Sequence, residues 1–376
     1  MKKKIIALLL CLPLLCMTAY AAEERESFDD RAQWEASGAG ALFDQLPRET
    51  QDDLQQIGIE GNEDELPDAL SADRLAGSLL DITQREMHTP FASLGFLLAM
   101  LLLAAFFKGG ENALDSPLAP TVGTVMSAAV SVTAAAPIIA LIGQIGDVVE
   151  AACAFTESFA AVLIGILIAE GQTASAAGYS SFVFGAVEVS TVCVEALILP
   201  LLNIFLAMSC VSSVSQNIKV DSVIHFFEKN AKWLLSFLAV TLTAILSISG
   251  VISASADSLT SRTAKFMISG SVPVVGGAMS DAYLTIKSGM LLLRNSVGAF
   301  GMIAVAYVYL PLIVRTMLWN LVMEIGLSLC EGLGLDSIQK LMKSLSGMLS
   351  LMLGLLVFSL FLLTLGSIIV VMQKSM

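Results

Sequence analysis

The sequence predicts an all-α polytopic membrane protein with about seven transmembrane helices, broken or re-entrant in places, behind a short acidic extracytoplasmic segment. Hydrophobic residues make up 56% of the 376 residues, and the mean hydropathy is +0.80. Charged residues make up only 14%, whereas soluble domains carry about 25%. Several apolar runs also approach or exceed the roughly 20 residues that a helix needs to cross a bilayer. A soluble protein and a protein with a single anchor are therefore excluded.

Residues 1–21 are predicted to form a signal peptide. Three lysines, Lys2 to Lys4, precede an apolar run at residues 5–17, which is too short for a comfortable membrane span. Ala19, Tyr20 and Ala21 then give the small-x-small pattern of a cleavage site. Cleavage would make Ala22 the first residue of the mature chain, and an uncleaved anchor is the alternative.

Residues 22–90 form an acidic segment that signal cleavage would place outside the cytoplasm. The segment holds 18 acidic and 5 basic residues, so it accounts for the whole net charge of −13. It has few aromatic residues and is too polar for a large core of its own, which predicts a weakly structured or small helical region. The acidic balance argues against nucleic acid as a partner, because phosphate binding needs a basic surface.

Residues 91–376 are predicted to be the polytopic transmembrane domain. Seven apolar runs are the expected spans, at residues 91–107, 122–145, 159–169, 182–211, 233–254, 297–318 and 345–372. An acidic connection with Asp147, Glu150 and Glu157 is expected between the second and third spans. Seven spans behind an external N-terminus put three groups of cations inside, as the positive-inside rule favours. They are Lys108, the basic segment with Arg262, Lys265, Lys287 and Arg294, and Lys374 at the C-terminus.

Motifs of enzymes and metal sites are nearly absent from the chain. The two histidines, His88 and His225, lie far apart, and neither belongs to a His-Glu-x-x-His run. No glycine-rich loop ends in the Gly-Lys-Ser/Thr pattern that holds phosphates. The sequence therefore predicts no enzymatic activity, no catalytic residues, no cofactor and no metal.

Two carboxylates are candidate functional residues because they lie within an apolar run. Glu188 and Glu195 are seven residues apart, two helical turns, and would share one face of a helix. An ionised carboxylate within a membrane is costly and usually faces a partner or a watery cavity. The pair is interpreted either as the lining of a pathway or ion site, or as a polar stripe that seals a helix contact.

A second candidate is the stretch SRTAKFMISGSVPVVGGAMSD at residues 261–281. Arg262 and Lys265 are three residues apart, Pro273 and several glycines interrupt any helix, and Asp281 is expected to start the next helix as its N-cap. Broken backbone is tolerated in a membrane only where protein or water satisfies it. The stretch predicts a re-entrant or interfacial hairpin on the cytoplasmic side, and a plain loop with lipid-anchoring cations is the alternative.

This block, followed by LLLRNSVGAFG at residues 291–301, resembles the most recognisable part of the stage III sporulation protein AE family of endospore-forming Firmicutes. The order of a signal peptide, a short polar segment and a polytopic region is also similar to that family. No catalytic residues are established for it, so the resemblance transfers only the motif residues. They are Arg262, Thr263, Lys265, Pro273, Gly276 and Asp281.

The resemblance implies a membrane subunit of a secretion-like channel that joins the mother cell to the forespore and supports late forespore gene expression. Its implied location is the mother-cell membrane around the forespore. Its implied partners are the lipid bilayer and other stage III sporulation proteins: an ATPase, ring-forming subunits and small membrane subunits. The alternative is a permease-like transporter with its own membrane site, suggested by Glu188 and Glu195 and by a faint repeat. In that repeat, LPLL at 199–202 recurs as LPLI at 310–313, as in a parallel duplication.

Overall fold

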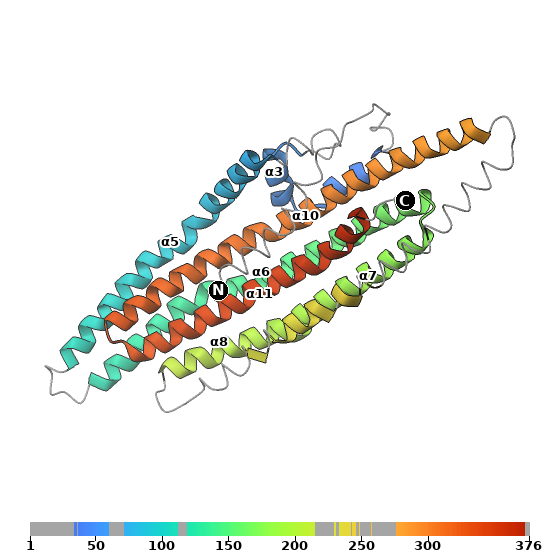
Figure 1. The fold of residues 1–376 in the computed structure, drawn as a ribbon. Helices are drawn as coiled ribbons and strands as arrows, with labels where there is room; N and C mark the ends of the chain where they lie inside the picture. The colour runs from blue at the N-terminus through green and yellow to red at the C-terminus, as the bar shows by residue number, and fades with distance from the viewer. Residues whose placement is uncertain are drawn as a thin grey trace.

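The computed structural model describes residues 34–35, 37–59, 71–111, 119–214, 229–230, 233–241, 243–245, 248, 257 and 276–372. These residues are helical apart from short turns, and no strand occurs among them. The long helices lie side by side in an elongated bundle (Figure 1). The predicted all-α class is confirmed, and within the described part of the chain five helices are long and apolar enough to cross a membrane.

The bundle is built from long elements preceded by two short ones. The short elements are the 3-10 helix η1 (Ala39–Gln45) and the helix α3 (Arg48–Gln56). The long helices are α5 (Ala72–Glu111), α6 (Ala119–Ala169), α10 (Gly276–Gly332) and α11 (Asp336–Met372). A further rod consists of α7 (Thr173–Thr191), the π-helix η3 (Val192–Ile198) and α8 (Leu199–Val214) in direct succession.

Among the described residues the number of candidate spans is below the predicted seven, in part because two predicted runs belong to one helix. Runs 122–145 and 159–169 both lie within α6, a helix of 51 residues. The acidic residues between them, Asp147, Glu150 and Glu157, are exposed on one side of this helix, so no connection is needed to keep them out of the core. The predicted span at 233–254 lies partly outside the described residues. The domain boundary after residue 90 stays a prediction, although α5 already begins at Ala72.

The two ends of the bundle are defined by their helix connections. At the α5–α6 end, Lys108 Nζ contacts the carbonyl of Gly334 and lies 3.7 Å from Asp336 Oδ2, in the turn between α10 and α11. At the α6–α7 end, Tyr179 Oη lies 3.0 Å from Ser367 Oγ near the end of α11. The end of α11 at Met372 therefore lies at the α6–α7 end (Figure 1).

The prediction that Lys108 and the C-terminus share one side is therefore wrong for this structure. Joining the two runs within α6 removes one crossing of the chain, so every later helix reverses its direction relative to the prediction. The helices that carry the two copies of the faint repeat, α8 and α10, both run towards the α5–α6 end.

The acidic N-terminal segment contributes side chains to the core of the bundle. The short helix η1 lies against α6, and α3 lies against α10. Trp34 is 2% exposed, with its ring centroid 6.2 Å from that of Phe300 in an edge-to-face arrangement. Leu54 and Ile57 are also buried. The described part of the segment is thus a small helical region that uses the long helices as its core.

The exposed surface changes from apolar to acidic along α6. Val125, Val132 and Ile139 are exposed in the half nearest the α5–α6 end, whereas the exposed acidic residues lie beyond them. The apolar part, residues 122–145, is roughly 36 Å long at 1.5 Å per residue, close to the roughly 30 Å of a bilayer core. Exposed apolar residues also cover α5 from 91 to 107 and α8 at Ile204 and Val211. We refer to this surface as the apolar belt.

Two glycines let the helices approach closely. A Cβ atom on Gly301 of α10 would overlap the ring of Phe159 on α6, so only glycine fits there without a shift of the ring or of the helix. A Cβ atom on Gly366 of α11 would lie 2.6 Å from Phe182 Cδ1. Small residues at such contacts are a common device for close helix packing in membranes.

Candidate functional site

The residues transferred from the family motif fall only partly within the described structure. Arg262, Thr263, Lys265 and Pro273 lie outside the described residues. Gly276 is the first residue of α10, and Asp281 lies five residues further along the same helix. The prediction that Asp281 starts a helix as its N-cap is therefore wrong. The helix starts at two glycines, which can adopt helical backbone angles although they lower helix propensity.

The residue just ahead of the motif, Asp257, caps a helix that is distant in sequence. Asp257 Oδ1 accepts a hydrogen bond from the backbone N–H of Ala174 at 3.0 Å, and its Oδ2 accepts one from Ser175 at 2.7 Å. The N-cap residue of α7 itself, Gln172, makes no side-chain hydrogen bond to the helix backbone. A carboxylate suits this position because it satisfies unpaired backbone N–H groups and the positive end of the helix dipole.

The residue that follows the motif on α10, Arg294, is fully buried and ion-paired. Its Nη1 donates hydrogen bonds to Glu170 Oε2 at 2.9 Å and to Gln172 Oε1 at 3.2 Å. Gln172 Nε2 in turn donates to Glu170 Oε2 at 2.6 Å. The side chains of Arg294 and Glu170 are 0% and 1% exposed. Removing either charge would leave the other buried without its counter-charge.

Both flanks of the family motif therefore converge on one turn, residues 170–175, which we call the anchor turn. Gly171 has a φ of +77° there, a conformation that glycine adopts without steric cost. Asp257 binds the end of the turn that opens α7, and Arg294 binds the end that closes α6. Asp257 and Arg294, which lie before and after the family motif in the sequence, are thus both bound at the α6–α7 end of the bundle.

Sequence reasoning assigned Arg294 to a cytoplasmic basic segment, and the structure corrects this. Its six neighbours in LLLRNSV include three leucines and a valine. An arginine in such a run signals a buried ion pair, but the sequence does not identify a carboxylate 124 positions away. The prediction that the motif and the N-terminal segment lie on opposite sides is also not supported. Trp34 contacts Phe300, six residues after Arg294, so both lie in the same half of the bundle.

A second polar group joins four helices nearer the middle of the bundle, and we call it the central cluster. Arg315 of α10 forms an ion pair with Glu86 of α5 and donates a hydrogen bond to Gln144 Oε1 of α6 at 2.9 Å. Arg85 makes a bidentate contact with Asp53 of α3, at 2.9 and 3.0 Å. Glu86 and Asp53 are buried, while the side chains of Arg85 and Arg315 are 41% and 32% exposed.

The predicted carboxylate pair lies on the outside of the bundle. Glu188 of α7 and Glu195 of η3 are both exposed. The wider turns of the π-helix change their angular spacing from that of a regular helix. Thr191 Oγ1 at the end of α7 lies 4.0 Å from Cys153 Sγ of α6, so the two helices pack together next to η3. Among the described residues, no three His, Cys, Asp or Glu side chains are arranged to hold a metal ion.

Comparisons with known proteins agree with the family motif. A family model described as stage III sporulation protein AE matches residues 62–375. A curated relative, "Stage III sporulation protein AE" of Bacillus subtilis (strain 168), is 26% identical over 155 residues. That alignment covers 41% of this chain and 39% of the relative's length. No solved structure matches the chain. Because the family model extends over most of its length, the chain belongs to the stage III sporulation protein AE family.

Proposed function

We propose that this chain is a membrane subunit of a secretion-like channel between mother cell and forespore, required for late forespore gene expression. It would sit in the mother-cell membrane around the forespore, together with an ATPase, ring-forming subunits and small membrane subunits. Family membership supports a sporulation role. The observation that carries the proposal is the anchor turn, to which Asp257 before the family motif and Arg294 after it are both bound. We propose that the motif between these two residues makes a docking contact, and we propose no enzymatic activity.

The proposed contact is made by Arg262 and Lys265, which follow Asp257, bound at the anchor turn, by five and eight residues in the sequence. The motif flanks share one half of the bundle with the N-terminal segment. If the signal peptide is cleaved as the sequence predicts, this half faces the space between the two membranes. The proposed docking site therefore lies outside the mother-cell cytoplasm, in place of the cytoplasmic position expected from the sequence.

The docking role is tested with Arg262→Ala combined with Lys265→Ala. A matched control is Lys340→Ala with Lys343→Ala, because these exposed lysines have the same spacing and lie near the opposite end of the bundle. We expect the first variant to reduce spore yield and the co-purification of partner subunits at normal protein level. The control should retain both. A normal spore yield in the Arg262 and Lys265 variant would refute the docking role.

The orientation is tested separately by cysteine accessibility in intact cells. Gln56→Cys in α3 and Lys340→Cys in α11 place exposed thiols on the two halves of the bundle. A membrane-impermeant maleimide should label the first position and spare the second until the membrane is opened. If only Lys340→Cys is labelled, the orientation is the reverse of the one proposed. The docking experiment would then test a contact on the cytoplasmic side.

A transporter with its own pathway remains a second candidate because Glu195 lies within a π-helix. π-helical turns inside longer helices are frequent at functional sites, and Glu195 is exposed on this one. Glu188→Gln combined with Glu195→Gln separates the two candidates. Normal assembly with lost sporulation favours the pathway, whereas normal assembly and normal sporulation favour a scaffolding subunit.

A further inference from the structure

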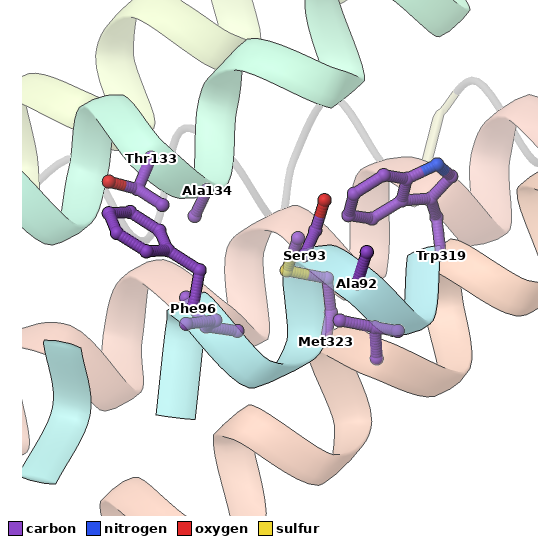
Figure 2. Close-up of a pocket in the computed structure, with 9 residues that line it drawn as sticks. Ala92, Ser93, Phe96, Thr133, Ala134, Trp319 and Met323 are labelled. Atoms are coloured by element: carbon purple, nitrogen blue, oxygen red, sulfur yellow. The ribbon is translucent and has the colours of Figure 1, made fainter. Parts of the chain in front are cut away.

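A cavity of about 310 Å³ lies between α5, α6 and α10 (Figure 2). Most of its nine lining residues are apolar, while Ser93 and Thr133 add hydroxyl groups and Trp319 adds an indole N–H. Phe96 at its edge is 59% exposed, whereas Trp319 on α10 is 4% exposed. The cavity therefore leads from the surface of the bundle towards its interior. Its volume is at the lower end of the roughly 300–1,000 Å³ of sites that hold small molecules.

The cavity lies within the apolar belt. Phe91 and Leu102 on α5, Val132 on α6 and Leu321 on α10 are exposed around it or along the same helices. A molecule that enters the cavity from this surface comes from an apolar medium. A water-soluble ligand would have to cross that medium first, so the position favours a lipid.

The central cluster lies at one end of the same cavity. Glu86 precedes Ser93 by seven residues on α5, and Arg315 precedes Trp319 by four residues on α10. Gln144 follows Thr133 by eleven residues on α6. Spacings of four, seven and eleven residues keep side chains on one face of a helix. Glu86, Arg315 and the amide of Gln144 thus lie on the same side of the cavity along the bundle, two charged groups and one neutral polar group on three helices.

The arginines of the central cluster are able to meet a headgroup. Arg85 and Arg315 are partly exposed although their carboxylate partners are buried. The hydrogen bonds of Arg315 use Nε and Nη1, and Nη2 has no hydrogen-bond partner among the residues that the structure describes. A guanidinium group offers five N–H donors in a planar fork that matches a phosphate.

We propose that this cavity and the central cluster form a binding site for one phospholipid, with an acyl chain in the cavity and the phosphate facing Arg315 and Arg85. The cluster lies at the edge of the apolar belt towards the α6–α7 end, so the lipid comes from the leaflet on that side. This inference does not depend on the proposed channel role, because it follows from the cavity, the belt and the cluster.

The first test is native mass spectrometry of the full chain, purified from membranes and washed in a mild detergent. Ala92→Trp fills the cavity from an exposed position of its lining, and Ala99→Trp is the control, two turns along α5 and outside the lining. We expect the native chain to retain one phospholipid and Ala92→Trp to lose it roughly tenfold, a factor equivalent to about 1.4 kcal/mol. Ala99→Trp should retain it. The site would be overturned if both variants retain phospholipid equally or lose it equally. It would also be overturned if the native chain carries only detergent.

The phosphate contact is tested by Glu86→Gln with Arg315→Gln, which removes both charges of the buried pair together. We expect lower retention of phospholipid than in the native chain, and unchanged retention would overturn the role of Arg315.

A second measurement tests the site without the cavity-filling substitution. Trp34→Phe with Trp233→Phe leaves Trp319 as the sole tryptophan of the three in the chain. In vesicles of brominated phospholipid, an acyl chain in the cavity should quench Trp319 fluorescence strongly although the residue is 4% exposed. Fluorescence equal to that in unbrominated vesicles would refute the proposal.

Discussion

Replacement of Glu170 by alanine is expected to destabilise the bundle more than replacement of any exposed carboxylate. The substitution leaves Arg294, whose side chain is 0% exposed, without its counter-charge. Removal of one partner from a buried ion pair costs about 3–5 kcal/mol. Gln172 also loses the acceptor of its 2.6 Å hydrogen bond, a contribution of about 0.5–1.5 kcal/mol that overlaps with the first. We therefore expect a loss of at least about 3 kcal/mol.

The matching double variant, Glu170→Leu with Arg294→Met, separates the charge from the packing. It replaces both charged side chains by apolar ones of similar size, a change that is often neutral or stabilising. We expect the double variant to be clearly more stable than Glu170→Ala. Glu195→Ala is the control for a carboxylate on the surface, where changes usually stay within about 0.5 kcal/mol.

The assay is thermal unfolding of the four purified proteins in one detergent, followed by circular dichroism at a helix band. At about 2 °C per kcal/mol for a large domain, Glu170→Ala should lower Tm by roughly 6 °C. Glu195→Ala should change Tm by about 1 °C. A Tm of Glu170→Ala equal to that of Glu195→Ala would refute the buried ion pair. A double variant less stable than Glu170→Ala would contradict the argument that the unpaired charge of Arg294 causes the loss of stability.

Three further changes test the packing of the bundle. Gly301→Ala forces a shift at the contact of α10 with α6 and should cost about 1–3 kcal/mol, whereas Gly354→Ala, where a Cβ atom meets no neighbour within 4 Å, should not lower Tm. Asp257→Ala removes the cap of α7 and should cost about 0.5–2 kcal/mol, seen as faster amide exchange in the first turn of α7 and nowhere in α11. Trp34→Ala should cost about 3–5 kcal/mol and expose residues 34–59 to protease, and unchanged digestion would argue against docking of this segment.

The fold class could be predicted from the sequence because hydrophobicity is a property of the whole chain. The span count could not, because exposed acidic residues within one helix resemble a connection. Asp147, Glu150 and Glu157 interrupt the apolar pattern of α6 without interrupting its backbone. Only packing shows which face of a helix is exposed.

In the candidate site, too, local patterns could be predicted from the sequence and long-range contacts could not. The motif around Arg262 is a local pattern, so it identified the family. The pairing of Arg294 with Glu170, and the cap that Asp257 provides for α7, join positions more than 80 residues apart. Their partners depend on how α6, α7 and α10 meet, which the spacing of residues along one segment does not contain.

The unbroken course of α10 has a mechanical consequence. Its 57 residues form a strut roughly 86 Å long at 1.5 Å per residue. Arg294 is held by its ion pair about a third of the way along this helix, and the turn to α11 follows its far end. Pro311 is the point at which such a strut bends most easily. A displacement or rotation of the α10–α11 turn would therefore be transmitted along the helix to the anchor turn, across the full thickness of a bilayer. Pro311→Ala would stiffen this transmission, and distances between spin labels at the two ends would measure the change.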